Sequence, residues 1–402
     1  MVNAETVTVW SLRGQPQFRL RGGRVGPPNC ITCIIPPQTR SEGDTWERDP
    51  LFPKSLNTKG FGSCARGDLA AKTRPHFRQL GGWLSEKQLP VVYSNKYNIS
   101  LLGFEHLHPL DSQKFRHVLG ALKSKGLVNI RKVVKPKPAS DHILGLVHSA
   151  DFLADIKRKW RMVKLTEMLP LVALPNMLLR DKILKPLKYH AGGTVLAAGL
   201  ALERGWSINL GGGMHHASHD KAAGWCAFAD ITLAIKHLRK ATSGRIQRFL
   251  VIDLDAHQGN GYQRDKLHFK DEDLYVLDVF NTQKFPKDDE AEVAINVAVP
   301  VKCGTSDAEY LTKLQVALEQ VAKDVNPDFI IYNAGADILR GDRHGQLNVS
   351  PEALVYRDQL VFRFALTTKV PICMLLSGGY SRIAAKTVAD SIQNLFKTFD
   401  LK

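Results

Sequence analysis

The sequence of 402 residues has no uninterrupted apolar run long enough to span a membrane, since the best candidate, residues 169–179, is broken by Pro170 and Pro175. Cysteine is also scarce, and the six cysteines are scattered without the spacing of a disulfide framework. Cys30 and Cys33 form one CxxC pair, but a structural zinc site would need a second pair, and none follows. These absences predict a soluble protein of a reduced compartment.

Acidic residues are outnumbered, with 39 Asp and Glu against 55 Lys and Arg, so the formal net charge is +16. Such a charge favours anionic surroundings or partners, although it would equally keep the chain soluble. The chain lacks the regular basic and aromatic interleaving of nucleic-acid readers, so we expect no direct sequence-specific binding of nucleic acid. Hydrophobic residues at 44% and charged residues at 23% are ordinary for a globular protein with a sizeable core.

Residues 1–88 carry scattered Arg, Pro and Gly without a sustained apolar period, which predicts a basic, poorly ordered N-terminal extension. Its basic character would permit an organelle transit peptide, whereas Glu5 and the acidic residues between 42 and 49 fit such a peptide poorly. Targeting by this extension therefore stays open. A β-type run and then helical periods begin at Leu89, so we place the folded domain at residues 89–402.

Within this domain, short apolar runs alternate with helical segments. This alternation predicts an α/β fold with a single open, mostly parallel sheet and helices on both faces. The expected strands are residues 89–93, 206–210, 249–254, 273–279, 329–332 and 370–376. The expected helices are residues 113–123, 187–204, 229–239, 307–323 and 351–366.

Four of the expected strands lead into loops that combine glycine with reactive side chains. These loops are residues 211–216, 255–261, 333–337 and 377–380. Parallel strands place their carboxyl ends at one edge of a sheet, where ligands bind in open α/β folds. Glycine lets the backbone approach a ligand closely, so we expect a narrow pocket at this edge.

Asp255 and His257 are two residues apart and project toward the same side of their strand end. With Asp337 from another loop they make three protein ligands, which leaves a fourth position open, as in a catalytic zinc site. An Asp-x-His pair alone is more often a capped strand with a solvated turn, and Asp337 alone would suit a helix cap. Their expected meeting at one edge favours the metal site.

His215 and His216 are candidate general bases and acids for a water molecule that the metal activates. Tyr380 follows two glycines and can donate a hydrogen bond to the oxyanion that forms at an attacked carbonyl. Asp253 lies deeper in its strand, so we interpret it as a partner that orients a histidine or as a structural buried carboxylate. Considered alone, the two histidines would be ordinary residues of a solvated loop, and Tyr380 would be an ordinary aromatic residue of the core or its rim. Jointly they predict a metal-assisted amide hydrolase.

Four sequence blocks resemble the signatures of zinc-dependent histone deacetylases: GGGMHH at 211–216, DLDAHQGNG at 253–261, NAGAD at 333–337 and SGGY at 377–380. The opening VYSNKYNI at 92–99 and LHP at 107–109 resemble the class IV branch. The resemblance runs from residue 89 to the end and implies the arginase–deacetylase fold. It also implies hydrolysis of N-acyl-lysine, acetyl or long-chain fatty acyl, in histones or other proteins of the nucleus or cytoplasm, and a role in regulating chromatin and transcription.

By this resemblance, Asp255, His257 and Asp337 would bind Zn²⁺. A structural K⁺ would use Asp253, with backbone oxygens near Asp255, His257 and Asp278.

The resemblance also makes His215 and His216 the acid/base pair and Tyr380 the residue that polarises the substrate carbonyl. Asn260 stands where many deacetylases have a carboxylate behind the second histidine, whereas class IV members resemble this chain at that position. This departure puts the tuning of that histidine's pKa in question.

Gly224, Trp225 and Phe285 are the residues expected to line the substrate channel. Trp225 stands where the family usually has Phe, which puts the channel width in question.

Three other functions compete with this interpretation. Ureohydrolases such as arginase share the Asp-Ala-His motif. Their two metals, however, need an Asp where this chain has Gly259 and another Asp where it has Leu339. A small-molecule amide hydrolase, acting for example on acetylpolyamines, would use the same chemistry. A metal-dependent scaffold with an inactive pocket is disfavoured, because a full acid/base and oxyanion set has no purpose there.

Overall fold

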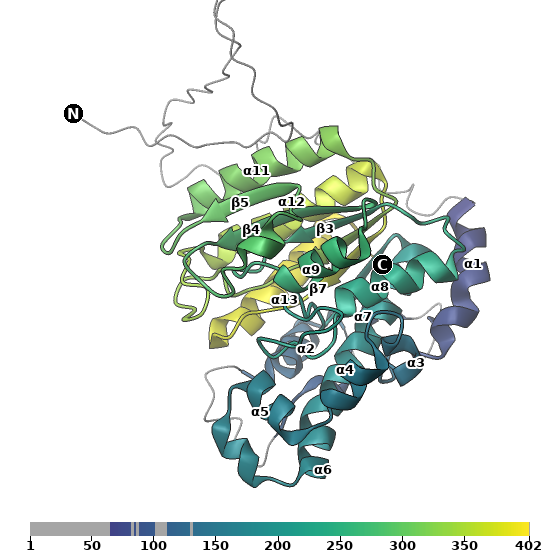
Figure 1. Cartoon of the computed structure of the whole chain (residues 1–402). Helices are drawn as coiled ribbons and strands as arrows, with labels where there is room; N and C mark the ends of the chain where they lie inside the picture. Colours follow the sequence, from purple (N-terminus) through teal and green to yellow (C-terminus); the bar gives the residue numbers. More distant parts are fainter. Residues whose placement is uncertain (1–64, 82–83, 86–87, 101–110, 129–131, 402) are drawn as a thin grey trace, which may run out of the picture. The chain divides into compact units, whose positions relative to one another are not determined.

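The computed structural model describes residues 65–81, 84–85, 88–100, 111–128 and 132–401 (Figure 1). Residues 1–64 of the expected N-terminal extension lie outside these ranges. Within them, no helix combines the length and the apolar content that crossing a bilayer requires.

Seven strands of the described residues form one sheet in the order β1-β2-β7-β6-β3-β4-β5, and every neighbouring pair is parallel. The strands are β1 Val91–Val92, β2 Trp206–Asn209, β3 Phe249–Asp253, β4 Leu274–Asn281, β5 Val297–Val301, β6 Phe329–Asn333 and β7 Ile372–Leu375. The four strands β2, β7, β6 and β3 are buried along their whole length, as expected where helices cover both faces of a parallel sheet. The predicted fold class is confirmed.

Alternate residues of each strand enter two cores, one on each face of the sheet. Leu250 and Ile252 of β3 pack with one set of helices, whereas Phe249 and Val251 pack with the other. The first set is α2 Lys114–Ser124, α11 Asp307–Asp324, α12 Pro351–Thr368 and α13 Arg382–Thr398. The second set is α1 Ala65–Arg78, α7 Lys185–Arg204 and α8 Asp230–Ala241 (Figure 1).

Shorter helices fill the connections. Between β1 and α7 the chain forms η2 Asn95–Tyr97, α3 Asp141–Leu144, α4 Ala150–Asp155, α5 Lys159–Thr166, η4 Leu169–Ala173, α6 Asn176–Leu179 and η5 Arg180–Leu184. After β3 and β4 it forms α9 Asn260–Phe269 and α10 Asp289–Glu292.

Strand β5 was absent from the expected set. It pairs only with β4 at the sheet edge, and its residues alternate between buried and exposed positions. Pro300 lies within it, which is tolerated because an edge strand has unpaired backbone groups on one side. A short alternating run with a proline gives a weak strand signal, so only the pairing with β4 reveals it.

Helix α1 corrects the domain boundary expected at residue 89. Phe77 is fully buried, and its ring lies against Gly199 of α7, where a Cβ would collide with it. Arg74 also donates two hydrogen bonds to Glu203 of α7, each 3.1 Å long. The boundary at 89 is therefore wrong for residues 65–81. The sequence pattern did not predict this helix because its stripe of buried residues is narrow and lies among charged residues.

Candidate active site

The four reactive loops follow strands that are direct neighbours in the sheet, β2, β7, β6 and β3. Their last residues are in register, since Asn209 pairs with Leu375, Leu375 with Asn333, and Asn333 with Asp253. Because these parallel strands end at one level, their loops leave from one edge of the sheet. The structure thus brings the four expected loops together.

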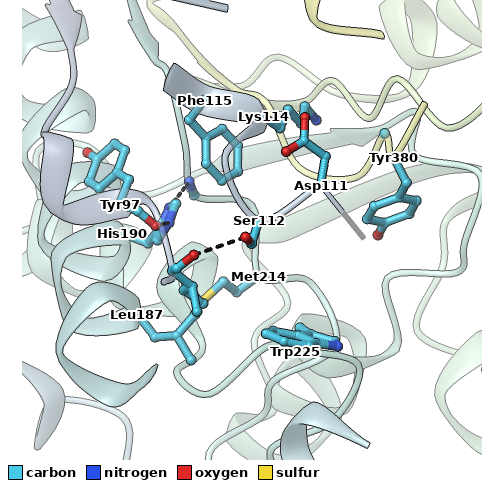
Figure 2. A pocket seen from close by; sticks show the side chains of 13 residues that line it. Tyr97, Asp111, Ser112, Lys114, Phe115, Leu187, His190, Met214, Trp225 and Tyr380 are labelled. Atoms are coloured by element: carbon cyan, nitrogen blue, oxygen red, sulfur yellow. Dashed lines mark hydrogen bonds between the residues drawn. The ribbon is translucent and has the colours of Figure 1, made fainter. Parts of the chain in front are cut away.

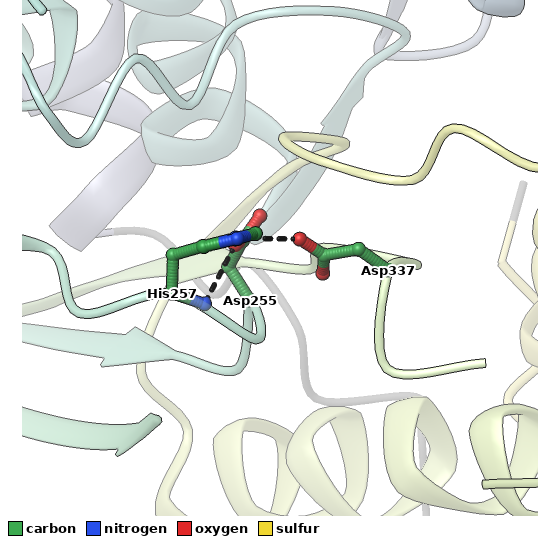
Figure 3. Close-up of side chains that lie close together, drawn as sticks. All are labelled: Asp255, His257 and Asp337. Atoms are coloured by element: carbon green, nitrogen blue, oxygen red, sulfur yellow. Dashed lines mark hydrogen bonds and ion pairs between the residues drawn. The ribbon is translucent and has the colours of Figure 1, made fainter. Parts of the chain in front are cut away.

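Asp255, His257 and Asp337 converge at this edge, with one ligand atom of each within 4.8 Å of the others (Figure 3). His257 Nδ1 lies 3.0 Å from Asp255 Oδ1 and 2.9 Å from Asp337 Oδ2, and all three residues are buried. Burial alone would lower the pKa of His257, but the two carboxylates raise it to about 10. The triad thus favours positive charge, and its nitrogen and oxygen donors fit a borderline divalent cation.

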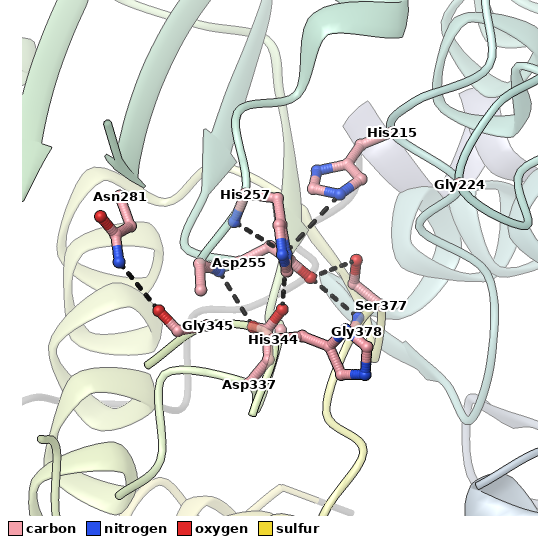
Figure 4. Close-up of polar contacts among 12 residues, drawn as sticks. His215, Gly224, Asp255, His257, Asn281, Asp337, His344, Gly345, Ser377 and Gly378 are labelled. Carbon is pink, nitrogen blue, oxygen red and sulfur yellow. Dashed lines mark hydrogen bonds and ion pairs between the residues drawn. The ribbon is translucent and has the colours of Figure 1, made fainter. Parts of the chain in front are cut away.

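Glycine is required where two loops pass the carboxylate of Asp255. A Cβ at Gly335 or at Gly378 would collide with Asp255 Oδ2. The N–H of Gly378 donates to this oxygen at 2.8 Å, and the Ser377 hydroxyl donates at 2.9 Å (Figure 4). These bonds hold the carboxylate in one orientation, as a metal ligand needs.

His215 contacts carboxylates through both ring nitrogens. Its Nδ1 lies 2.9 Å from Asp253 Oδ2, and its Nε2 lies 3.6 Å from Asp255 Oδ1. Burial alone would lower the pKa of His215, whereas the two carboxylates raise it to about 9. Asp253 thus lies where a residue that orients this histidine would be.

His216 instead faces a neutral amide, with its Nδ1 3.0 Å from Asn260 Oδ1. Burial, followed by the positive charges of His215 and His257, holds the pKa of His216 well below its usual value. At neutral pH His216 is therefore uncharged while its neighbour is protonated. Opposite pKa shifts of two neighbouring groups are typical of a pair in which one group acts as the acid and the other as the base.

Tyr380 lies half-buried near the triad. Burial, followed by the charges of Asp255 and Asp337, raises the pKa of its phenol well above the usual value. The hydroxyl therefore keeps its proton and is able to donate it in a hydrogen bond. The backbone N–H of Tyr380 donates to Asp342 Oδ2 at 2.9 Å, and its ring packs edge-on against His344.

Lys114, the first residue of α2, anchors the loop that carries Tyr380 and was not among the expected site residues. Its ammonium group donates to three successive carbonyl oxygens, those of Leu376 at 2.9 Å, Ser377 at 2.8 Å and Gly378. Burial lowers the pKa of Lys114 to about 8, although nearby carboxylates oppose the shift. Lys114 is more than 260 positions from its partners in sequence and lies outside the four loops, so only the tertiary structure reveals its role.

The residues expected to line a channel lie near His216 and Tyr380. The ring of Phe285 packs edge-on against His216 with 4.9 Å between centroids, and a Cβ at Gly224 would touch both rings. Trp225 adopts a left-handed backbone at φ 64° and lines a cavity together with Tyr380 (Figure 2). Phe285, with 48% of its surface exposed, does not line that cavity.

The cavity beside Tyr380 has mostly apolar walls. Its other lining residues include Tyr97, Ile99, Phe115, Leu187, His190 and Met214, with Lys114 and Asp111 as the charged members (Figure 2). His190 stacks on Tyr97 with 4.3 Å between centroids, and burial lowers the pKa of His190 to about 4. This part of the wall is therefore uncharged at neutral pH.

Asp253 and Asp278 are register partners at the ends of β3 and β4, and both are buried. Asp278 Oδ2 accepts hydrogen bonds from the Gly259 N–H at 2.9 Å and from Gln263 at 2.5 Å. Asp278 Oδ1 has no hydrogen-bond partner among the described residues. Two adjacent buried carboxylates with an unpartnered oxygen would suit a bound cation, and Asp253 is the carboxylate that the resemblance assigns to a structural K⁺.

Two further buried charges that the sequence did not single out position the loops. Arg357 donates through one nitrogen to the carbonyls of Leu254 at 3.1 Å and Gly335 at 2.6 Å. Asp230 accepts from the Gly213 N–H at 2.9 Å. For Arg357 the available signal was a charged residue inside a mostly apolar helix, whereas Asp230 is the first residue of α8, where an acidic side chain is ordinary.

A family model described as "Histone deacetylase domain" matches residues 108–396. Histone deacetylase 2 of Arabidopsis thaliana is 44% identical over 308 residues, covering 77% of this chain and 79% of that protein. An uncharacterised protein of Picosynechococcus sp. is 30% identical over 73% of this chain and 92% of its own length.

Among solved structures, an HDAC homologue complexed with SAHA has a TM-score of 0.59 at 23% identity, covering 79% of this chain and 85% of its own. The HD domain of HDA15 has a TM-score of 0.60 at 18% identity, covering 78% of this chain and 95% of its own. These two structures support the fold.

Proposed function

The chain belongs to the histone deacetylase family of hydrolases, and we propose that its site cleaves the amide bond of an N-acyl-lysine side chain with the help of bound Zn²⁺. The observation that carries this proposal is the convergence of a buried three-ligand triad with two histidines of opposite pKa shift. A divalent cation held by Asp255, His257 and Asp337 would polarise the substrate carbonyl and acidify a water molecule.

His216 is the general base of this proposal. It is uncharged at neutral pH because burial and neighbouring positive charges hold its pKa well below the usual value. Its Nδ1 is engaged by Asn260, which leaves Nε2 to accept a proton from water. His215, held protonated by Asp253 and Asp255, supplies positive charge and a proton for the leaving amine.

Tyr380 donates its hydroxyl proton in a hydrogen bond to the oxygen of the attacked carbonyl, where negative charge develops. Its raised pKa keeps this proton in place at neutral pH. Lys114 holds the Tyr380 loop through three backbone carbonyls, so the hydroxyl is positioned before the substrate arrives.

The apolar cavity beside Tyr380 supports an acyl group larger than acetyl as a substrate. Ile99, Phe115, Leu187 and Met214 offer a hydrocarbon wall next to the residue that would contact the carbonyl. Removing apolar acyl carbons from water at this wall would contribute about 0.8 kcal/mol per CH₂.

We propose that the chain is of the class IV type, which the amide of Asn260 behind His216, in place of a carboxylate, supports. Histones or other acylated proteins of the nucleus or cytoplasm are the proposed partners, with regulation of transcription as the proposed role. A structural K⁺ is also proposed, bound at Asp253 with backbone oxygens near Asp255, His257 and Asp278, since carboxylate and carbonyl oxygens suit a hard cation.

A panel of acyl-lysine peptides, from acetyl to long-chain fatty acyl, tests the proposal on the purified protein. We expect amide hydrolysis that a chelator abolishes and zinc restores, with kcat/KM rising as the chain lengthens. An acetylated polyamine and arginine serve as competing substrates. Faster turnover of either one, or a metal content of two per chain, would refute the proposal.

A further inference from the structure

The amide of Asn260 bridges His216 to a carboxylate on a different loop. Asn260 Oδ1 lies 3.0 Å from His216 Nδ1, and Asn260 Nδ2 donates to Asp288 Oδ2 at 2.9 Å. The Asp288 side chain is only 9% exposed. Arg264 of α9 donates to both of its oxygens, through Nε and a terminal nitrogen, each at 2.6 Å. This two-bond pair fixes the carboxylate plane.

The ionised carboxylate determines which way the amide faces. Burial alone would raise the pKa of Asp288, but hydrogen bonds from Arg264 and Asn260 lower it, so the group stays ionised at neutral pH. An ionised carboxylate only accepts hydrogen bonds, so the NH₂ group of Asn260 has to face Asp288. The carbonyl oxygen then faces His216, and it accepts a proton only if Nδ1 carries one.

We propose that Asp288, clamped by Arg264, is a positioning residue for amide hydrolysis: it orients Asn260 and thereby keeps the proton of His216 on Nδ1, leaving Nε2 free as the base. This inference rests on the proposed function. A chain of contacts from histidine to amide, carboxylate and guanidinium stands here in place of the direct histidine–carboxylate contact expected in many deacetylases.

The backbone of Asp288 is held as firmly as its side chain. Its N–H donates to Gln258 Oε1 at 3.1 Å, and its carbonyl accepts from Gln258 Nε2 at 3.0 Å. Asp288 Oδ1 also caps α10 by accepting from the Ala291 N–H at 3.2 Å. Asparagine is an equally good cap, so Asp288→Asn removes the charge while sparing this local structure.

A double-mutant comparison separates this role from a merely structural one. Asp288→Asn permits the Asn260 amide to flip, so we expect kcat on an acyl-lysine peptide to fall about 10- to 100-fold with little change in KM. In an Asn260→Ala background the amide that links Asp288 to His216 is absent, so adding Asp288→Asn should change kcat about twofold or less. Each kcat is taken on that variant's own pH plateau. An equal loss in both backgrounds would overturn the proposal.

Glu290→Gln is the matched control, because Glu290 is the other carboxylate that Arg264 contacts, at 3.3 Å, and it is 85% exposed. It should leave kcat and KM unchanged. If Asp288→Asn does not fold, Arg264→Gln frees the same carboxylate and should lower kcat in the same direction.

The tautomer of His216 gives a readout that needs no substrate. In the zinc-loaded protein, ¹⁵N spectra should show the Nδ1–H form of His216, assigned by comparison with His216→Gln. Asp288→Asn should shift this signal toward a mixture of both tautomers. An unchanged Nδ1–H signal would refute the positioning role of Asp288. If Asp288→Asn shifts the His216 signal but the zinc-loaded wild type does not hydrolyse acyl-lysine peptides, the proposed substrate is wrong and the contact from Asp288 to His216 is supported.

Discussion

His215 and His216 are neighbours in sequence, but His215 contacts carboxylates and His216 contacts an amide. Asp253 and Asp255 raise the pKa of His215 to about 9, whereas burial and neighbouring positive charges hold the pKa of His216 well below its usual value despite its hydrogen bond with Asn260. The opposite pKa shifts of the two histidines thus follow from the carboxylates around His215 and from the burial and neighbouring positive charges of His216.

Asn260→Asp should move the acidic limb of kcat/KM to higher pH. His216 has to be neutral to accept a proton, and a carboxylate beside it favours the charged imidazole and raises its pKa. Activity would therefore be lost at a higher pH on acidification. The measurement is a pH profile of the folded variant, with zinc content as a control that should not change. An unmoved limb would make His215 the better candidate for the base.

Tyr380→Phe should lower kcat about 10²- to 10³-fold, because it removes the hydroxyl proposed to stabilise the developing oxyanion. Substrate affinity should change less, since the ring remains. Steady-state kinetics on an acyl-lysine peptide gives both values. Tyr275→Phe is the matched control. Tyr275 lies at the start of β4, the end of the strand away from the reactive loops, and its hydroxyl donates to Asp324, so the loss of this hydroxyl should not affect turnover. If kcat is unchanged in Tyr380→Phe, Tyr380 does not stabilise the oxyanion and only the bound metal would do so.

Helix α1 is the element that most changes the interpretation of the chain. Its buried residues recur with helical spacing at Leu69, Ala70, Thr73 and Phe77, and this stripe packs on α7. Because α7 also lines the cavity through Leu187 and His190, α1 supports the layer from which part of the site is built.

Phe77→Ala should lower the free energy of unfolding by about 3–5 kcal/mol, since it empties a fully buried ring position against Gly199. Urea unfolding of the full-length chain measures the change. Arg74→Gln, on the exposed side of the same helix, should cost less than about 1 kcal/mol. Equal stabilities of Phe77→Ala and the wild type would mean that α1 contributes nothing to the fold.

On the scale of the whole molecule, the triad joins loops that leave two separate strands, β3 and β6. Two further strands, β2 and β7, bring the histidines and Tyr380 to the same edge. A cation bound there would neutralise buried carboxylates of distant sequence segments, so its binding would stabilise the native fold.

Metal removal should therefore abolish activity and lower the melting temperature together. Zinc present at about 100 times its Kd would add roughly 2.7 kcal/mol to the free energy of unfolding. Calorimetry on the chelated and zinc-loaded protein measures the shift. Asp337→Ala, which lacks one ligand, should melt at the same temperature with and without zinc. A zinc-dependent shift in this variant would remove Asp337 from the ligand set.

The α/β class and the four reactive loops follow from the sequence, because strand ends in parallel sheets share one edge and the loops carry chemistry that is readable locally. All six expected strands match observed ones within two residues at either end, and β1 and β7 each start two residues later than expected. The same local logic failed for β5 and α1, whose apolar patterns are short or narrow.

Only the tertiary structure decided which residues support the reactive ones. Lys114, Arg357 and Asp288 are charged side chains that would ordinarily be read as solvated, and each is buried or nearly so against groups far away in sequence. The physical reason is that burial of a charge is favourable only when partners satisfy it, and those partners come from other strands and loops. Sequence determined the reacting groups and their common edge, whereas the fold determined their protonation and orientation.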